Sequence, residues 1–327
     1  MMKLVSLLLL AVAPLAVHAT TPLVYSHSAV VYNVNLRQVL LEKNPDEVVP
    51  LASLTKLMTA MIVLDEAPAL EETLTIDGAD IDQLKHSRSR LPVGATLERK
   101  EMLRLALMSS ENRTASALSR AIHGGQPAFI RKMNEKAKEL DMAHTHFEDP
   151  TGLSPQNVST ARDVVKMADA ASRYSLIDEF TTLSHYSEQV SAGTLFYRNT
   201  NPLIGRPGWD IQISKTGFTD EAHRCIVIEA NMPNGPVIVV LMGARSSGMR
   251  SADLYSIRNW LEGNETPVAT PRAYYVSTTL HHHKAVAGPR NSKVRLIAYS
   301  ARSATNAHRP SGKHKTRKRP HSFPPSA

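Results

Sequence analysis

A serine and a lysine lie three residues apart in the stretch ASLTKLMTAM, at positions 53 and 56. On a helix this spacing places Ser53 and Lys56 on one face, where an amine can take the proton of a hydroxyl. A serine at a helix start also lies near the positive end of the helix dipole, which favours an oxyanion there. The pattern S-x-x-K alone is weak, because it is expected about once by chance in a chain of this length. A buried helix capped by Ser53 accounts equally well for these ten residues.

Two further motifs favour the catalytic interpretation. Ser110 and Asn112 lie in an expected break between two helices, which frees their side chains to face a cleft. Lys215, Thr216 and Gly217 end an apolar strand, where the lysine could be a solvated edge charge but the glycine admits close approach of a substrate backbone. Each motif thus falls in a structural context in which its side chains could share one cleft.

The elements that follow Ser53 are almost all helical. The segment after Ser53 is apolar on most of its sides, which predicts a central, buried helix. Further helices are expected at 98–109, from the break to about residue 123, at 127–140, and after Ser159 and Thr160, which can cap a helix. We expect this helical lobe to span about residues 51–184.

Segments with a period of two lie on both sides of the helical lobe and predict strands. They are residues 24–33, 38–43, 186–190, 194–198, 210–216, 224–230 and 236–243. Pro233, Asn234 and Gly235 predict a hairpin turn between the last two, and 251–261 a closing helix. The first two strands should join the later ones, because an isolated hairpin is marginally stable. The fold class is therefore α+β: an antiparallel sheet flanked by helices, with an all-helical lobe inserted through it and a site in the cleft between them.

The first 19 residues are expected to be a signal peptide rather than part of the fold. Lys3 precedes an apolar run at 4–17, and Val17, His18 and Ala19 fit a cleavage site. An uncleaved N-terminal anchor is the alternative, but a run of about 14 residues that contains Pro14 is short for a membrane span.

The last part of the chain, 266–327, is expected to be a basic, disordered tail. Of the 38 Lys and Arg residues, 11 lie in 273–327, and this segment contains none of the 30 Asp and Glu residues. The rest of the chain therefore has 27 basic and 30 acidic residues. The body therefore lacks the charge pattern of a nucleic-acid-binding protein. The three consecutive histidines at 281–283 could bind a metal ion, although a solvated low-complexity segment is the simpler interpretation. The single cysteine, Cys225, excludes an internal disulfide and is expected to be a buried thiol.

Taken together, the motifs resemble those of the low-molecular-mass penicillin-binding proteins, a family of D-alanyl-D-alanine carboxypeptidases and endopeptidases with the serine β-lactamase fold. The resemblance runs over about residues 24–262, and the stretches that carry it are ASLTKLMTAM, SSENRTASAL, FEDPTGLS and SKTGFTDEAHRC. The short endopeptidase branch, of the penicillin-binding protein 7 type, is the most similar. We see neither a second β-rich domain after Leu261 nor the amphipathic C-terminal helix of the membrane-anchored carboxypeptidases. A D,D-peptidase domain at 20–265 is implied.

The resemblance implies a catalytic role for three side chains. Ser53 would attack the carbonyl of a D-alanine and form an acyl-enzyme. Lys56 would be the base, with its pKa lowered by burial and by the charge of Lys215. Ser110 would relay a proton to the leaving nitrogen. No metal or organic cofactor is implied.

The same resemblance implies a set of substrate-binding groups. Asn112 would hydrogen-bond the substrate's amide chain, and Lys215 with Thr216 would hold its carboxylate, next to Gly217. The backbone N–H groups of Ser53 and Phe218 would form the oxyanion hole. The expected partners are peptidoglycan stem peptides, with β-lactams as covalent inhibitors, in the periplasm and without a membrane anchor or nucleic acid. Asp149 and Gly152 are expected to shape a loop.

Three other functions remain open at the level of the sequence. A D-alanyl-D-alanine carboxypeptidase differs from an endopeptidase only in its leaving group, and the motifs do not separate the two. A class A β-lactamase needs a glutamate that holds the deacylating water, and the stretch DPTGLSPQN has none. A peptidoglycan-binding module without activity would not need an intact set of Ser53, Lys56 and Lys215.

Overall fold

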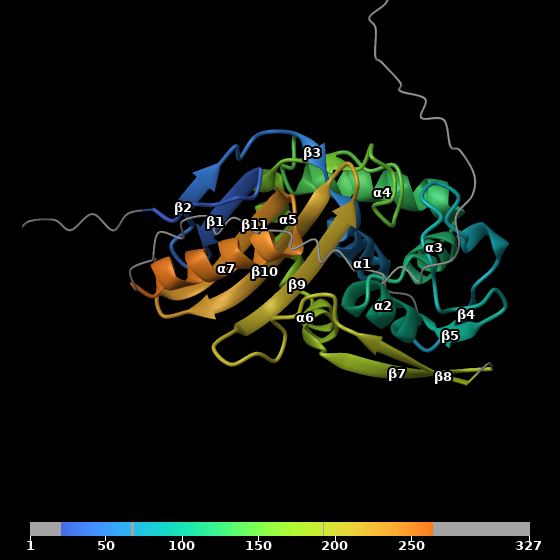
Figure 1. The fold of residues 1–327 in the computed structure, drawn as a ribbon. Helices are drawn as coiled ribbons and strands as arrows, with labels where there is room; N and C mark the ends of the chain where they lie inside the picture. The colour runs from blue at the N-terminus through green and yellow to red at the C-terminus, as the bar shows by residue number, and fades with distance from the viewer. Residues whose placement is uncertain (1–20, 67–68, 192, 264–327) are drawn as a thin grey trace, which may run out of the picture. The chain divides into compact units, whose positions relative to one another are not determined.

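The computed structural model describes residues 21–66, 69–191 and 193–263 (Figure 1). Contacts divide the chain into residues 1–272 and 273–327, and every described residue belongs to the first of these units. The expected signal peptide, the domain boundary at 265 and the basic tail lie outside the described residues. Within the described ranges, no helix is both long and apolar enough to cross a bilayer.

Five antiparallel strands form the main sheet, in the order β2-β1-β11-β10-β9 (Figure 1). The strands are β1 (Ser28–Asn33), β2 (Gln38–Lys43), β9 (Asp210–Thr219), β10 (His223–Met232) and β11 (Gly235–Ala244). The N-terminal hairpin therefore joins the C-terminal strands as expected, with Val30 opposite Val240. Pro233 and Asn234 form the turn between β10 and β11, as their sequence predicts.

Both faces of this sheet are buried, because helices cover each of them. On β10, Cys225 and Val227 pack into one apolar core, whereas Ile226 and Ile228 pack into a second core on the opposite face. Helix α7 (Ser247–Leu261) lies across this second face and contacts β10 and β11 (Figure 1). Cys225 is a free, buried thiol, and burial raises its pKa to about 11.

The helices between β3 and β7 supply most of the first core. They are α1 (Thr55–Asp65), α2 (Arg99–Met108), α3 (Asn112–Arg120), α4 (Gly125–Glu139), α5 (Ala161–Ala171) and α6 (Ser175–Thr182). Nine of the 11 residues of α1 are buried, and α1 contacts α2, α3, α4 and α5. The predicted central helix is therefore confirmed. Helix α5, however, packs on β1, β10 and β11, so it covers the sheet as well as belonging to the helical segment. Helix α6, which the sequence pattern did not indicate, packs on α2 and β9.

The smaller strand pairs stand apart from the main sheet. Strands β7 (His185–Val190) and β8 (Gly193–Arg198) pair only with each other, although their alternating pattern resembles that of sheet strands. Two very short pairs, β3 (Val49–Pro50) with β6 (Val158–Ser159) and β4 (Thr73–Thr75) with β5 (Thr96–Glu98), connect distant segments. Two or three residues are too few for a periodic pattern, so these pairs could not be predicted from the sequence.

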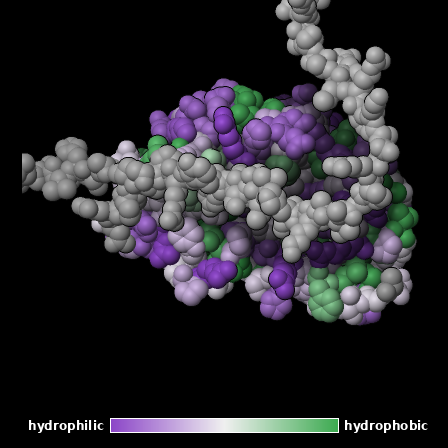
Figure 2. Space-filling view, viewed as in Figure 1, coloured by the Kyte–Doolittle hydropathy of each residue, from purple (hydrophilic) through white to green (hydrophobic). Residues whose placement is uncertain are grey.

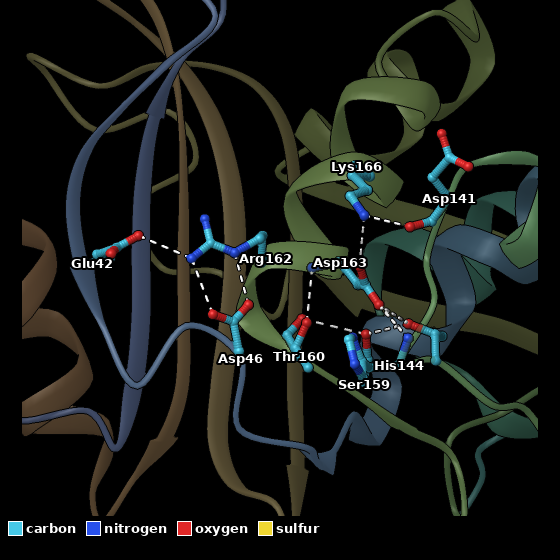
Figure 3. A network of polar contacts seen from close by, with 10 residues as sticks. Glu42, Asp46, Asp141, His144, Ser159, Thr160, Arg162, Asp163 and Lys166 are labelled. Carbon is cyan, nitrogen blue, oxygen red and sulfur yellow. Dashed lines mark hydrogen bonds and ion pairs between the residues drawn. The ribbon is translucent and has the colours of Figure 1, made fainter.

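A polar network fixes the start of α5 (Figure 3). Thr160 caps the helix by accepting the N–H of Asp163 at 3.1 Å. The buried carboxylate of Asp163 accepts the N–H of His144 at 2.9 Å and pairs with Lys166 at 2.9 Å. On the outer side of the helix, Arg162 pairs with Glu42 at the end of β2 and with Asp46 in the loop after this strand. The network thereby joins the sheet to the loop that leads toward residues 148–154.

The outer surface differs from these cores in composition. On the face shown in Figure 2, hydrophilic residues predominate and apolar residues occupy separate small areas. This distribution is the one expected when the large apolar side chains are packed in the two cores.

Candidate active site

Ser53 lies on a sharp turn immediately before α1. The turn is a short 3-10 helix, Ala52–Leu54, and Ala52 has a φ of +46°, in the left-handed region that a residue with a Cβ rarely adopts. The side chain of Ser53 caps neither this turn nor α1, which begins at Thr55. The interpretation of Ser53 as a helix cap is therefore wrong, and its hydroxyl is available for other contacts.

Lys56 is directed back at Ser53 from the first turn of α1. Its Nζ lies 3.0 Å from Ser53 Oγ, 2.7 Å from Asn112 Oδ1 and 2.7 Å from the backbone oxygen of Thr151. The lysine is 1% exposed. The S-x-x-K spacing thus brings the two side chains together as predicted, and two carbonyl oxygens complete the environment of the amine.

Burial determines the protonation of Lys56. Desolvation lowers its pKa to about 8, against the opposing effect of the negative charges of Asp149, Glu111 and Asp82. The expected contribution from Lys215 is not among the causes of this shift. The effect instead runs in the other direction, because the charge of Lys56 lowers the pKa of Lys215. A pKa near 8 leaves about a tenth of the Lys56 side chains neutral at pH 7.

The three neighbours of Lys56 orient its lone pair when the amine is neutral. Carbonyl oxygens can only accept hydrogen bonds, so those of Asn112 and Thr151 take the two N–H groups of a neutral amine. The third neighbour, the hydroxyl of Ser53, is the only one of the three that can donate a proton. The lone pair therefore faces the proton that a base must remove.

A second serine–lysine pair lies across the site. Ser110 occupies the break between α2 and α3 with a φ of +61°, and its Oγ accepts a hydrogen bond of 3.0 Å from Lys215 Nζ. Lys215 is 1% exposed and also donates to the oxygen of Thr216 at 2.9 Å. Burial, the charge of Lys56 and the charge of Arg250 hold the pKa of Lys215 well below its usual value. The predicted S-x-N and K-T-G motifs therefore meet in space.

Strand β9 runs past the turn that carries Ser53. A Cβ on Gly217 would lie 3.0 Å from Ala52 Cβ and 3.1 Å from Ser53 N. The glycine therefore permits close approach of β9 to the serine's own backbone, whereas the sequence suggested close approach of a substrate. This contact brings the N–H of Ser53 next to the segment that contains Phe218, as an oxyanion hole formed by these two residues would require.

The loop with the sequence DPTGLS supplies the carbonyl group at Lys56. The carboxylate of Asp149 accepts the backbone N–H groups of Thr151, Gly152 and Ser154. Gly152 has a φ of +82°, and a Cβ there would lie 1.9 Å from the oxygen of Ala52. Both residues thus shape the loop, which fits directly against the turn of Ser53.

Asn157 connects this loop to α1. Its Oδ1 accepts the N–H groups of Glu148 and Asp149, and its Nδ2 donates to the oxygen of Asp149 at 2.8 Å and to Thr55 Oγ1 at 3.2 Å. The backbone oxygen of Asn157 also accepts the N–H of Leu51 at 2.8 Å. Sequence reasoning missed this residue, because the partners that connect it to α1, Thr55 and Leu51, lie about 100 positions away and leave no local pattern.

A cavity of about 540 Å³ opens above these groups. Six of the eight predicted site residues line it: Ser53, Ser110, Asn112, Thr216, Gly217 and Phe218. The two lysines lie beneath its floor, where their Nζ atoms reach the two serine hydroxyls. A larger hollow of about 1030 Å³ lies between α4 and residues 141–148, but it contains none of the predicted site residues.

Other lining residues were not anticipated. Thr200 contacts the K-T-G motif, with 2.7 Å between its Oγ1 and that of Thr216. Arg250, on α7, is 7% exposed and donates from one terminal nitrogen to the oxygen of Cys225 at 3.1 Å, whereas its Nε has no hydrogen-bond partner among the residues that the structure describes. Burial and the nearby charge of Arg224 lower the pKa of Arg250. Because the charge of Arg250 also lowers the pKa of Lys215, the two buried side chains lie close enough to act together on a negatively charged group.

Acidic side chains do not contact the nucleophile directly. Among the residues that the structure describes, no carboxylate forms a hydrogen bond with Ser53 or Lys56, and no group of three His, Cys, Asp or Glu residues could hold a metal ion. Glu148, the acid closest in sequence to the DPTGLS loop, is about half exposed and contacts Ser154 and His146. The arrangement is suited to lysine-activated acyl transfer.

Comparison with known proteins agrees with this chemistry. A family model described as D-alanyl-D-alanine carboxypeptidase matches residues 15–246. The chain is 43% identical over 263 residues to a D-alanyl-D-alanine endopeptidase of Escherichia coli K12, covering 80% of this chain and 85% of that protein. It is also 43% identical over 253 residues to a D-alanyl-D-alanine endopeptidase of Pseudomonas aeruginosa, covering 76% and 82% of the two chains.

Solved structures have the same fold. The crystal structure of the Streptomyces K15 DD-transpeptidase matches with a TM-score of 0.70 and 27% identity, over 75% of this chain and 99% of that one. A D-alanyl-D-alanine carboxypeptidase from Mycobacterium tuberculosis matches with a TM-score of 0.67 and 25% identity, over 75% and 94% of the two chains.

Proposed function

Since the chain belongs to the D-alanyl-D-alanine carboxypeptidase family and is a serine D,D-peptidase, we propose that Ser53 is its nucleophile and Lys56 the base that activates it. The observation that carries this assignment is the 3.0 Å contact between Ser53 Oγ and a buried amine whose pKa is about 8. Such a pKa lies close enough to neutral for a lysine to act as a general base.

Acylation follows from the positions of the two serine–lysine pairs. Neutral Lys56 takes the proton of Ser53 as the oxygen attacks the D-alanyl carbonyl carbon. The carbonyl oxygen becomes an oxyanion, which the N–H groups of Ser53 and Phe218 would stabilise. As the amide bond breaks, Ser110 would pass its hydroxyl proton to the leaving nitrogen and take a replacement proton from Lys215 Nζ, 3.0 Å away. Water then hydrolyses the ester on Ser53 and restores the enzyme.

The other predicted residues would hold the substrate on either side of the reacting bond. Lys215, Thr216 and Arg250 would bind the carboxylate that flanks the bond, since Thr216 and Arg250 line the cavity and Lys215 is buried directly beneath them. Asn112 already donates to Ser87 Oγ at 2.9 Å and accepts from Lys56, so its first task is to hold the lysine. It would contact a substrate amide only by exchanging the bond to Ser87.

We propose that the preferred substrate is a cross-linked stem peptide, cleaved between D-alanine and the diaminopimelate side-chain amine of the neighbouring stem. The endopeptidase names of relatives at 43% identity support this preference over removal of a terminal D-alanine. The enzyme would act on peptidoglycan in the periplasm, after removal of residues 1–19, and β-lactams would acylate Ser53.

Digestion of two substrates side by side tests the preference. Purified enzyme is incubated with cross-linked muropeptide dimers and with a stem pentapeptide, and the products are separated by chromatography. We expect dimers to be cleaved to monomers with the higher kcat/KM. Release of D-alanine without cleavage of dimers would identify a carboxypeptidase instead. Cell-wall cleavage that persists unchanged in Ser53→Ala would remove the enzymatic assignment of this site.

A further inference from the structure

A series of cationic side chains leads from the nucleophile out of the site. Lys56 contacts Ser53, and its charge lowers the pKa of Lys215. Arg250 also lowers the pKa of Lys215, and Arg224 in turn lowers that of Arg250. The mechanism above uses the first three cations, and it gives no role to Arg224.

Arg224 is held in place by an aromatic ring. It lies on β10 directly opposite Phe218 of β9, and its guanidinium carbon is 3.8 Å from the centre of the Phe218 ring. Phe218 is 48% exposed, and both residues line the cavity that contains Ser53. Stacking on the ring fixes the plane of the guanidinium and leaves its N–H groups free to bind a ligand at the ring's edge.

The guanidinium donors of Arg224 are unused in the described part of the chain, where this side chain forms no hydrogen bond or ion pair and contacts the ring of Phe218. Asp220 lines the same cavity without pairing with it. Lys85, the other cation on the rim, is already paired with Glu221. Arg224 is therefore a preorganised cation that lines the cavity and is not paired with an acid. It lies further along the cationic series than Lys215 and Arg250, to which the proposed function assigns the first carboxylate.

Resting on that proposed function, we propose that Arg224 is a specificity residue that binds a second carboxylate on the leaving-group side of a cross-linked substrate. A released D-alanine has one carboxylate, which flanks the reacting bond. The leaving stem of a cross-link has this carboxylate and further ones along its peptide. Two anions on one leaving group match two successive cationic positions, at Lys215 with Arg250 and at Arg224, whereas D-alanine reaches only the first.

The inference predicts a change in the ratio of two activities. Arg224→Gln removes the charge and the paired donors, and we expect the ratio of kcat/KM for the cross-linked dimer to that for the pentapeptide to fall about tenfold or more. Arg224→Lys should restore only part of the ratio, because an ammonium lacks the planar fork. Arg245→Gln is the matched control, since Arg245 is exposed and lines a neighbouring cavity without Ser53. It should keep the wild-type ratio.

Chemical changes to the substrate provide an independent test. A dimer whose leaving stem has every carboxylate beyond the first converted to an amide should lose about tenfold in kcat/KM with wild-type enzyme and little with Arg224→Gln. Equal losses in the two enzymes would overturn the proposal. A wild-type ratio in Arg224→Gln would also overturn it. Labelling by a fluorescent penicillin, measured in parallel, identifies any variant whose site has not folded.

Failure of the proposed function gives a different result. If wild-type enzyme cleaves only the pentapeptide, the endopeptidase preference is wrong, and inhibition by the free leaving stem still tests Arg224. The stem with its carboxylates intact should inhibit about tenfold better than the amidated stem in wild type, with no difference in Arg224→Gln. Inhibition that is insensitive to amidation in wild type would reject the role of Arg224.

Discussion

The Nζ atom of Lys56 lies 3.0 Å from Ser53 Oγ and 2.7 Å from the backbone oxygen of Thr151. The serine and the carbonyl group come from segments almost 100 residues apart, and both contact the same atom, Lys56 Nζ. Because the carbonyl can only accept a hydrogen bond, the loop that contains Thr151 helps to turn the lone pair of a neutral lysine toward the nucleophile.

Acylation should depend on pH through Lys56. The reactive form is neutral, and the pKa of Lys56 is about 8. The rate of acylation by a β-lactam should therefore rise about tenfold per pH unit below 8 and level off above it. Stopped-flow labelling between pH 5.5 and 9.5 measures this profile. A rate that is constant from pH 6 to 8 would contradict the role of Lys56 as base.

Asp149→Asn should change this profile in two ways. The negative charge of Asp149 raises the pKa of Lys56, so its removal should move the midpoint to lower pH. The maximal rate should also fall, about tenfold or more, because the carboxylate holds three backbone N–H groups of the loop. Glu148→Gln is the control, since Glu148 is not among the causes of the lysine's shift. A midpoint that moves upward in Asp149→Asn would refute the electrostatic argument.

Gly152→Ala should damage both stability and activity. A Cβ at this position would lie 1.9 Å from the oxygen of Ala52, at a φ of +82°. We expect a loss of about 3 kcal/mol or more in the free energy of unfolding, together with slow acylation. Gly205→Ala is matched in backbone strain, with a φ of +74° and no atom within 4 Å of its Cβ, and should cost only about 1 kcal/mol. Urea denaturation compares the two, and equal losses would mean that strain alone explains the effect.

The network in Figure 3 makes a prediction about stability alone. Asp163→Ala leaves the N–H of His144 and the amine of Lys166 without their buried acceptor, and should cost about 2–4 kcal/mol. Arg162→Ala removes the ion pairs with Asp46 and Glu42 at the surface and should cost only about 1 kcal/mol. Thermal unfolding followed by circular dichroism measures both. Similar losses in the two variants would contradict the importance given to burial.

The sequence was informative wherever chemistry depends on local spacing. Ser53 and Lys56 are joined by one helical turn, so their contact could be predicted from three positions of separation. The core helix α1 and the strands of the main sheet followed from apolar periodicity, whereas the joining of the first hairpin to the later strands followed from the marginal stability of an isolated hairpin. For the serine–lysine contact, the helix and the strands, the pattern that carries the prediction lies within a single element or turn.

Contacts between distant segments could not be predicted in this way. The roles of Thr151, Asn157 and Arg250 depend on which loops meet after folding, and no period or spacing marks them. Strands β7 and β8 show the same limit, because a period of two indicates a strand but not its partner. The sequence also predicted that the charge of Lys215 would lower the pKa of Lys56, whereas burial accounts for that shift and Lys215 is not among its causes.

Mapping of the covalent β-lactam adduct tests the central claim most directly. Wild-type protein and Ser53→Ala are incubated with a fluorescent penicillin, digested with trypsin and examined by mass spectrometry. If Ser53 is the nucleophile, we expect one lasting adduct, attached to Ser53 in the wild type and absent from Ser53→Ala. An adduct on another residue, or rapid turnover of the penicillin with no lasting label, would contradict it.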